Sequence, residues 1–422
     1  MYKNGYEKLK ANILNDFQNK CRFLLFDFNG EYTSKDCITP DKKVFNLSTQ
    51  IVNGDKIPIP EEMLLEHEML SILSDATDKT QKPFLKRVLS LYHIVYKEKN
   101  PLNYFRNILI NNIEKTFLNS DKLKADTIID LYRQLFDKDE IVSDIVFNAS
   151  INQKKWFFVN GDGYIDDKSS IPKMDIYSCA KSFTFPSDLL DNFLKFSCLQ
   201  LIQEIISNRS EHSHVSPVIN RLISNKNDIK KIFDTSGEKE FWEESNFIVI
   251  NLNMVNLTMK KTLPLLISKW AYNNKKQEDK KSSLSFIIDE AHNILSSTSN
   301  RESESWKDYR LETFEEIIKE GRKFGVFVTI SSQRPNDISP TIISQAHNYF
   351  IHRLINQNDL YAIQKAVSYI DKVSEESIPT LPRGTCIFSG VLSQMPFKLR
   401  VTELDNKHKP KSNTLSFNDF ID

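Results

Sequence analysis

The stretch Ser285-Phe-Ile-Ile-Asp289-Glu290-Ala-His292 decides the fold. A short apolar run that ends in two acids is typical of a strand in a parallel sheet, because such strands are covered on both faces. Open α/β sheets bind their ligands at the carboxyl ends of their strands. Acids at a strand end also cap the helix that follows. The two carboxylates are therefore either part of a ligand site or helix caps.

The ligand interpretation has a definite chemistry. In phosphate-loop NTPases an acid at such a strand end holds the magnesium ion or its water, and the next acid polarises the attacking water. This interpretation predicts Asp289 on the metal side and Glu290 as the catalytic base. The letters Asp-Glu-Ala-His also match a helicase box, but the Ser-Ala-Thr and Gln-x-x-Gly-Arg-x-Gly-Arg elements of those helicases do not occur in the sequence.

A second polar group follows one helix and one strand later. Glu320-Gly-Arg322-Lys-Phe-Gly325 precedes an apolar run, and Ser332-Gln333-Arg334-Pro335 comes after it. A glutamine there can hydrogen-bond a γ-phosphate or the attacking water, and an arginine can stabilise transferred charge from a neighbouring subunit. Taken alone, basic residues at a helix end are explained by the helix dipole. Their position after the Asp-Glu strand end favours the catalytic interpretation.

The rest of the chain predicts an α/β fold with an insertion. Apolar runs alternate with helical patterns after residue 245, including helices over 257–275 and 310–324, and such alternation is typical of an α/β sheet. Amphipathic stretches fill the region from about 58 to 231 and predict a mostly helical inserted domain. The predicted parts are 1–55 (a helix and the strand Cys21–Asp27), 56–240 (the insertion), 241–404 (the second part of the sheet) and 405–422 (a polar tail).

Several motifs together resemble one family, the HerA branch of the HerA/FtsK hexameric DNA-translocating ATPases. The similar regions are residues 1–50 and 245–402, whereas the helical insertion agrees with the family only in position and helical character. The resemblance implies a RecA-like parallel sheet core of a P-loop ATPase. The motifs are Phe26-Asp-Phe-Asn-Gly-Glu-Tyr32, Ile288-Asp-Glu-Ala-His-Asn293, Glu320-Gly-Arg-Lys-Phe-Gly325, Ser332-Gln-Arg-Pro335, Ile343-Ser-Gln345, His352-Arg-Leu-Ile-Asn-Gln-Asn-Asp359 and Leu381-Pro-Arg-Gly-Thr-Cys-Ile-Phe-Ser-Gly390.

The resemblance also implies roles for individual residues. Glu290 would be the catalytic base, Arg322 a finger acting across the subunit interface, and Gln333 the sensor of the γ-phosphate. Glu31 would face the nucleotide or organise water beside it. The cofactor would be ATP with Mg²⁺, the ion being held through water by Asp289. The positions implied to contact the cofactor or its phosphates are Asp27, Asp289, Arg334 and Arg353.

One element of the family is missing from the sequence. The chain has 10 glycines in 422 residues, and no pair of them forms Gly-x-x-x-x-Gly-Lys-Ser/Thr or Gly-x-Gly-x-x-Gly. Lys3-Asn4 stands about where the phosphate loop belongs, but no glycine precedes it. A phosphate-binding nest needs glycines, because the backbone must approach the phosphates closely. We expect a truncated or internally initiated product without loop and N-terminal barrel rather than a degenerate, non-hydrolysing relative, since the other catalytic positions are well formed.

Composition sets weaker limits on partners and location. Lys and Arg number 56 and Asp and Glu also 56, so no global basic field indicates nucleic acid. Five cysteines without a Cys-x-x-Cys predict free thiols in a reducing cytoplasm. No apolar run reaches the ~18 residues of a membrane span. The basic runs Asn225–Lys231 and Asn274–Lys281 are interpreted as solvated faces rather than as DNA contacts.

The partners are implied by the resemblance alone. In this family a hexameric ring passes double-stranded DNA through its central pore, held by contacts to backbone phosphates. The resemblance implies such a homo-hexamer, acting with a nuclease or other effector in DNA processing or antiviral defence. The alternative is a scaffold with the same fold that does not hydrolyse ATP. A third interpretation is a monomeric accessory subunit.

Overall fold

The computed structural model describes residues 20–411 except 52, 120, 151–153, 162, 244, 279–281, 299–301, 303 and 368–369. The chain folds into two compact units. The first, called the split unit, comprises Met1–Ile59 and Lys230–Asp422; the second, called the helical unit, is Pro60–Ile229. The predicted divisions lay after residues 55 and 240. The helix predicted before Cys21 lies outside the described residues.

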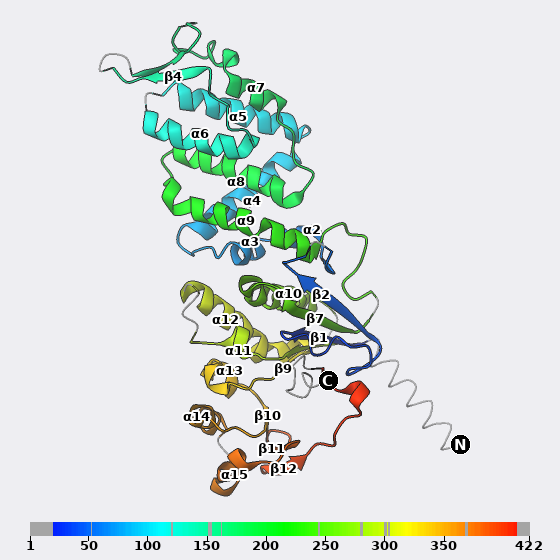
Figure 1. Cartoon of the computed structure of the whole chain (residues 1–422). Helices are drawn as coiled ribbons and strands as arrows, with labels where there is room; N and C mark the ends of the chain where they lie inside the picture. Colours follow the sequence, from blue (N-terminus) through cyan, green and yellow to red (C-terminus); the bar gives the residue numbers. More distant parts are fainter. Residues whose placement is uncertain are drawn as a thin grey trace, which may run out of the picture. The chain divides into compact units, whose positions relative to one another are not determined.

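The split unit is built on a five-stranded parallel sheet, which confirms the predicted fold class (Figure 1). Along each strand, alternate side chains enter one core. Leu24, Phe26, Ile250, Phe286 and Ile288 are all fully buried there. Because every strand runs the same way, all carboxyl ends share one edge. The strands, in sheet order, are β2 (Lys42–Ser48), β7 (Phe247–Met254), β1 (Cys21–Asp27), β8 (Ser283–Ile288) and β9 (Val326–Ile330).

Helices of the split unit lie together against one side of this sheet in Figure 1. These are α10 (Leu257–Gln277), α11 (His292–Leu295) and α12 (Glu304–Glu320). Helix α12 begins six residues before the predicted position 310 and ends at 320 rather than 324, where the 3₁₀ turn η2 (Gly321–Phe324) takes over. The outer edge of β9 pairs with no described strand, and Phe327 on it is 50% exposed.

The apolar runs 385–389 and 397–401 predict two strands that close the domain as an antiparallel edge. They do pair antiparallel, but in a separate sheet with β10 (Asn348–Ile351) and not at the edge of the parallel sheet. This three-stranded antiparallel sheet packs one face on a cluster containing Ile351, Ile387, Ile363 and Ile378. Its elements and their connections are α13 (Pro340–Ser344), β10 (Asn348–Ile351), α14 (Gln357–Ala366), α15 (Lys372–Ser377), η4 (Ile378–Thr380), β11 (Thr385–Gly390) and β12 (Phe397–Arg400). On the other face Phe350, on the outer strand β10, is 60% exposed.

The segment predicted as a polar tail is partly attached. After η5 (Asn406–His408), the amide of Lys411 donates to the carbonyl of Glu31 at 2.9 Å. A ring nitrogen of His408 lies 2.7 Å from the carbonyl oxygen of Asp36. The described part of the tail therefore contacts the loop that follows β1. A short parallel pair, β3 (Ile57–Pro58) with β6 (Phe233–Asp234), lies where the chain leaves and re-enters the split unit.

The helical unit surrounds one apolar helix. Helix α8 is buried on nearly all sides, as expected of a central helix with apolar residues all round it. A buried ion pair between Glu204 of α8 and Arg87 of α4, at 2.5 Å, ties two of the helices together. The helices are α2 (Glu61–Leu64), α3 (His67–Leu73), α4 (Gln81–Lys97), α5 (Pro101–Phe117), α6 (Lys122–Phe136), α7 (Asp175–Ser182), α8 (Leu189–Ile206) and α9 (His212–Ile232).

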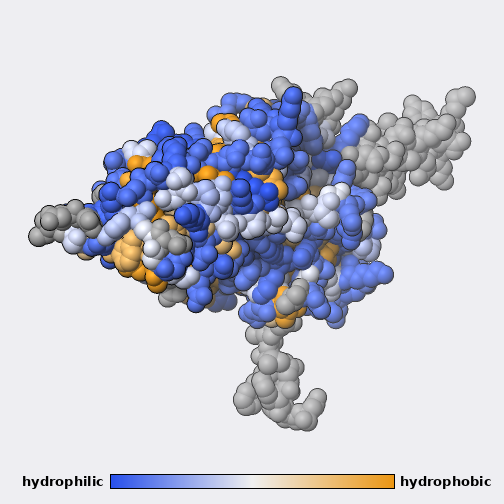
Figure 2. Space-filling model, turned by 90° about the horizontal axis from the view of Figure 1, so that it is seen from above, coloured by the Kyte–Doolittle hydropathy of each residue, from blue (hydrophilic) through white to orange (hydrophobic). Residues whose placement is uncertain are grey.

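The hairpin predicted from the aromatic run between residues 156 and 165, with its turn near Gly161, is present in the helical unit. Strand β5 (Lys155–Phe158) is joined to the residues after the turn by the antiparallel bridge Phe157–Tyr164, and the amides of Phe158 and Ile165 donate to the carbonyls of Gly163 and Trp156 at 3.0 and 2.9 Å. Strand β5 also pairs antiparallel with the earlier strand β4 (Ile145–Asn148), which the sequence did not predict. The surface in Figure 2 is mostly hydrophilic with scattered apolar side chains. Among the described helices, none has the length and apolar character that a membrane crossing requires.

Candidate nucleotide site at the acidic edge

The predicted site residues come from the carboxyl ends of three neighbouring strands. Asp27 ends β1, Asp289 and Glu290 follow β8, and Gln333 follows β9. Strand β8 lies between β1 and β9, so the fold brings these side chains to one edge of the sheet. Glu31, in the turn after β1, is close enough to Asp289 for their charges to interact. We call Asp27, Glu31, Asp289 and Glu290 the acidic edge.

Asp27 shapes the turn that carries Glu31. Its side chain is fully buried, and its two oxygens accept hydrogen bonds from the amides of Asn29, Gly30, Glu31 and Tyr32 at 3.3, 2.7, 3.1 and 2.9 Å. Both oxygens are thus used by the backbone. The observed role of Asp27 is to hold the turn, and its predicted contact with the cofactor stays a prediction.

Ionisation of Asp289 and of Glu31 is unfavourable at this edge, and the pKa of each carboxyl is raised. Burial raises the pKa of the Asp289 carboxyl, and hydrogen bonds from Ser331 and Tyr32 offset part of that rise. Burial is also the largest cause that raises the pKa of Glu31, followed by repulsion from Asp289. Desolvation and like charge both favour the protonated carboxyl. The acidic edge therefore favours a neutralising partner.

Glu290 stands at a strained turn and contacts the predicted sensor. Its φ of 45° lies in the left-handed region, which is uncommon for residues other than glycine. The Nε2 of Gln333 donates to Oε1 of Glu290 at 2.7 Å. The amide of Ala291 donates to the carbonyl of Ser331 at 2.8 Å, so the loops after β8 and β9 are joined beside this contact. Strain of this kind is concentrated at functional sites.

The predicted arginines are not gathered at the acidic edge. Arg322 is exposed on η2, which precedes β9, so it lies at the amino end of that strand. The five residues of β9 separate it from the Glu290 side by roughly 16 Å, at ~3.3 Å per residue. Arg334 is exposed next to Gln333, and Arg353 is exposed two residues after β10. Their roles stay predictions.

The donor set suits a hard cation bound together with phosphate. Within the described residues there is no cluster of three or more His, Cys, Asp or Glu side chains arranged for a metal ion. Mg²⁺ is commonly held by one or two carboxylates plus substrate phosphates and water. The half-buried Asp289, with its raised pKa, offers such a carboxylate. The residues present fit Mg²⁺ with ATP, not an all-protein metal cage.

Three residues of the site escaped prediction. Ser331 and Tyr32 hydrogen-bond Asp289, and His292 Nδ1 lies 3.2 Å from Oε2 of Glu290. Tyr32 and His292 lie within motifs that the sequence analysis quoted, but no role was assigned to them. The available signal was position along the chain, because Tyr32 and His292 stand within five residues of a predicted acid and Ser331 stands two residues before Gln333.

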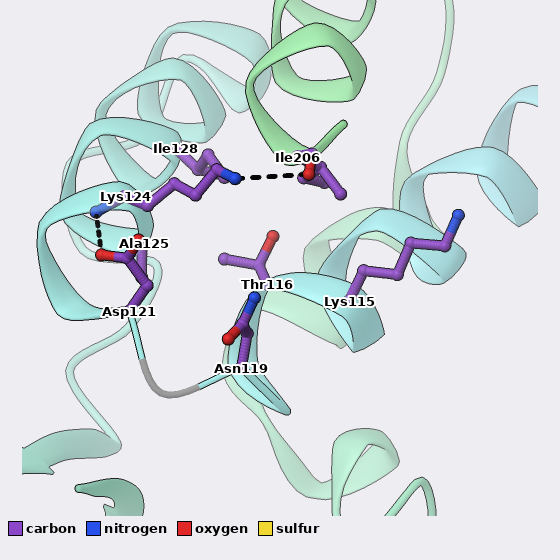
Figure 3. A pocket seen from close by; sticks show the side chains of 8 residues that line it. All are labelled: Lys115, Thr116, Asn119, Asp121, Lys124, Ala125, Ile128 and Ile206. Carbon is purple, nitrogen blue, oxygen red and sulfur yellow. Dashed lines mark hydrogen bonds between the residues drawn. The ribbon is translucent and has the colours of Figure 1, made fainter. Parts of the chain in front are cut away.

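Two cavities of the described residues lie elsewhere. A hollow between α5, α6 and α8 has a volume of about 10 Å³, roughly the space of one water molecule. Figure 3 shows Lys124 reaching across it to the carbonyl of Ile206, at 3.3 Å. A larger cavity of about 320 Å³ lies beside β10 and β11, with Tyr349, Val367 and Met395 in its lining. Neither cavity includes a residue of the acidic edge.

A parallel sheet with carboxylates at the carboxyl ends of its strands is the architecture expected of the predicted RecA-like fold class. Comparison with known proteins shows what the chain is similar to. The chain is 25% identical over 388 residues to the DNA double-strand break repair helicase HerA of Sulfurisphaera tokodaii, covering 91% of this chain and 59% of the relative. It is 31% identical over 121 residues to HerA of Saccharolobus solfataricus, covering 29% of this chain and 23% of the relative. These relatives support the predicted resemblance to the HerA/FtsK-type ATPases.

The matches cover only part of the curated relatives. The chain spans less than two thirds of the length of these curated relatives. No protein-family model matches it. Among solved structures, VirB4 of Thermoanaerobacter pseudethanolicus aligns with a TM-score of 0.46 and 12% identity, over 94% of this chain and 85% of that one.

Proposed function

We propose that this chain is the subunit of an ATP-driven motor that moves double-stranded DNA through a hexameric ring. The observation that carries the proposal is the 2.7 Å contact between Gln333 and Glu290, directly beside Asp289. A carboxylate and an amide on adjacent loops can activate and orient the water that attacks a γ-phosphate. The relatives' name, DNA double-strand break repair helicase, supports DNA as the substrate.

Each residue of the site would have its own role in ATP hydrolysis. Glu290 accepts a proton from the attacking water, after Gln333 has turned from the carboxylate to the phosphate. Asp289 would hold Mg²⁺ through water, and the bound ion would supply positive charge that stabilises the transferring phosphoryl group. Arg322 is exposed at the amino edge of the sheet and is free to act on a neighbouring subunit's nucleotide. Arg334 and Arg353 are further candidates for phosphate or interface contacts.

A motor of this kind also needs a loop that binds phosphates, and the sequence contains no Gly-x-x-x-x-Gly-Lys-Ser/Thr. The outer edge of β9 offers a place for the strand that carries such a loop. It pairs with no described strand, Phe327 on it is half exposed, and the loop after β9 carries Gln333. One more parallel strand at this edge would place its carboxyl end next to Gln333 and Glu290.

The remaining parts of the proposal concern assembly. We propose a ring of about six chains in the cytoplasm, working with a nuclease or other effector in DNA processing or anti-phage defence. The mass of the native assembly tests the ring, because a hexamer weighs about six times 49.1 kDa. A species of 49.1 kDa would instead support a monomeric accessory subunit.

ATP turnover by the complete chain, with and without double-stranded DNA, tests the motor. Glu290→Gln is expected to abolish turnover, whereas Glu304→Gln, an exposed glutamate on α12, is expected to leave it unchanged. General-base catalysis contributes about 10²–10⁴ in rate, so the loss is easily measured. If Glu290→Gln still turns over ATP, Glu290 is not the catalytic base.

The second candidate function is a scaffold that assembles through the same fold without hydrolysing ATP. The missing phosphate-loop motif is the observation that favours it. Nucleotide binding separates the two functions, because a ring that binds neither ATP nor ADP in the presence of Mg²⁺ supports the scaffold. Turnover that depends on Glu290 contradicts it.

A further inference from the structure

The carboxylate of Glu290 has two oxygens in different environments. Oε1 accepts the hydrogen bond from Gln333. Oε2 is buried and has no aligned hydrogen-bond donor in the described part of the chain. A buried carboxylate oxygen without a donor is costly, and more so than an ordinary buried polar group because it carries charge. The group best placed to satisfy it is the imidazole of His292, with Nδ1 at 3.2 Å.

The orientation of the His292 ring is set from a second direction. Its Nδ1 also lies 3.3 Å from Oγ of Ser332, and this hydroxyl oxygen accepts a hydrogen bond from the amide of Arg334 at 3.0 Å. Nδ1 therefore faces a carboxylate oxygen and a hydroxyl oxygen. The Ser332 hydroxyl can accept from a proton on Nδ1 or donate to a lone pair there, so the carboxylate decides: it attracts a proton on Nδ1 and repels a lone pair. The surroundings thus favour the tautomer that carries its proton on Nδ1.

We propose that His292 is a positioning residue for the catalytic base, holding one oxygen of Glu290 while Gln333 holds the other. The inference rests on the proposed function, in which Glu290 is that base. The two contacts differ in access, because Gln333 is exposed whereas the His292 side chain is only 20% exposed. A nucleotide can reach and withdraw Gln333, and the carboxylate then stays anchored through His292. The contact with His292 keeps Glu290 aimed after Gln333 has left.

Turnover measurements on substituted chains test this role. His292→Ala is expected to lower kcat about ten- to hundredfold, the scale on which misplacing a catalytic group acts. The KM for ATP should stay within about twofold, because the nucleotide itself loses no contact. His292→Asn is expected to recover most of kcat, because the Asn Nδ2 stands as far from the backbone as the His Nδ1. His93→Ala, an exposed histidine on α4, is the matched control.

The same variants distinguish a positioning role of His292 from a purely structural one. A purely structural role would lower the melting temperature of His292→Ala, and a donor-free side chain of similar size, in His292→Leu, would rescue it as well as asparagine. Rescue by asparagine and not by leucine is the expected result. An alanine variant with unchanged kcat, or an asparagine variant as slow as alanine, overturns the proposal.

The tautomer of His292 can be measured without ATP turnover, so it tests the positioning role separately from the motor function. In ¹⁵N-histidine-labelled chain at pH 8.5, solid-state NMR distinguishes the two neutral tautomers whatever the size of the assembly. The His292 signal, identified by its loss in His292→Asn, is expected to carry the proton on Nδ1 and to move it to Nε2 in Glu290→Ala. A proton on Nε2 in the native chain overturns the positioning role. The expected signals together with no ATP turnover would overturn only the motor.

Discussion

Replacement of Asp27 by asparagine tests whether the acidic edge depends on its buried anchor. The Asp27 carboxylate is fully buried and accepts four main-chain hydrogen bonds, from residues 29 to 32, at 2.7–3.3 Å. An asparagine side chain of the same shape has only one acceptor oxygen. Its oxygen can keep the three amides now bound to Oδ1, but its NH₂ group then faces the amide of Tyr32, and two donors meet.

The cost follows from these contacts. Losing one hydrogen bond to a charged acceptor costs about 1.5–3 kcal/mol, and leaving a buried donor unpaired costs about 1–3 kcal/mol. The two terms overlap, because both concern the amide of Tyr32. We therefore expect Asp27→Asn to lower the free energy of unfolding of the split unit by about 2–4 kcal/mol. Loosening this turn should also release Glu31 from its place beside Asp289.

Urea unfolding followed by tryptophan fluorescence measures this loss. Of the four tryptophans, only Trp156 belongs to the helical unit, so a Trp156→Phe background makes the signal specific to the split unit. Asp36→Asn is the matched control, since it makes the same chemical change at an exposed position of the following loop. It is expected to change stability by less than about 0.5 kcal/mol. A loss below about 1 kcal/mol for Asp27→Asn would refute the anchoring role.

Three further changes test the same unit. Gly325→Ala should destabilise it by at least about 1 kcal/mol more than Gly237→Ala in urea unfolding; both have a φ of +74°, but only at 325 would a Cβ stand 2.7 Å from a carbonyl oxygen. Arg310→Ala should cost about 3 kcal/mol, the low end of the range for a broken buried pair, because the Glu302 side chain loses a guanidinium 2.6 Å away but keeps Lys261 at 3.4 Å; Arg310→Met with Glu302→Leu should recover most of this loss. Glu31→Gln should raise the melting temperature at pH 7.5. The raised pKa of Glu31 means that its stabilising contribution is complete at acid pH and is lost as the pH rises through that pKa, so the gain should vanish below about pH 4.

The sequence predicted the parts of the fold that follow from local pattern. The run ending in Asp289 is β8, and the run ending in Asp27 is β1, because long apolar stretches bounded by acids and turns have few alternatives. The meeting of Gln333 with Glu290 was also foreseeable, since the ends of neighbouring parallel strands share an edge. Once strand order is known, the site's main residues follow.

What could not be predicted depends on long-range pairing or on single side-chain directions. Strand β5 pairs with β4 as well as with the residues after its own turn, and no local pattern indicates this second partner. The C-terminal strands pair with one another, β11 with β12 across a short turn but β10 with β11 across a connection that contains α14 and α15. The role of His292 depends on the left-handed backbone conformation of Glu290. This conformation is uncommon for residues other than glycine, so the sequence does not predict it.

The electrostatics of the acidic edge limit what can bind there. Burial and mutual repulsion raise the pKa of both Glu31 and Asp289, so their charges oppose folding at neutral pH. A free nucleotide would add phosphate charge to carboxylates that already repel one another. A nucleotide accompanied by a divalent cation would instead neutralise both the phosphates and the acids. The same acids that weaken the empty edge are therefore expected to favour the metal–nucleotide complex over the free nucleotide, and this selectivity is what the proposed ATP-driven motor would require of these residues.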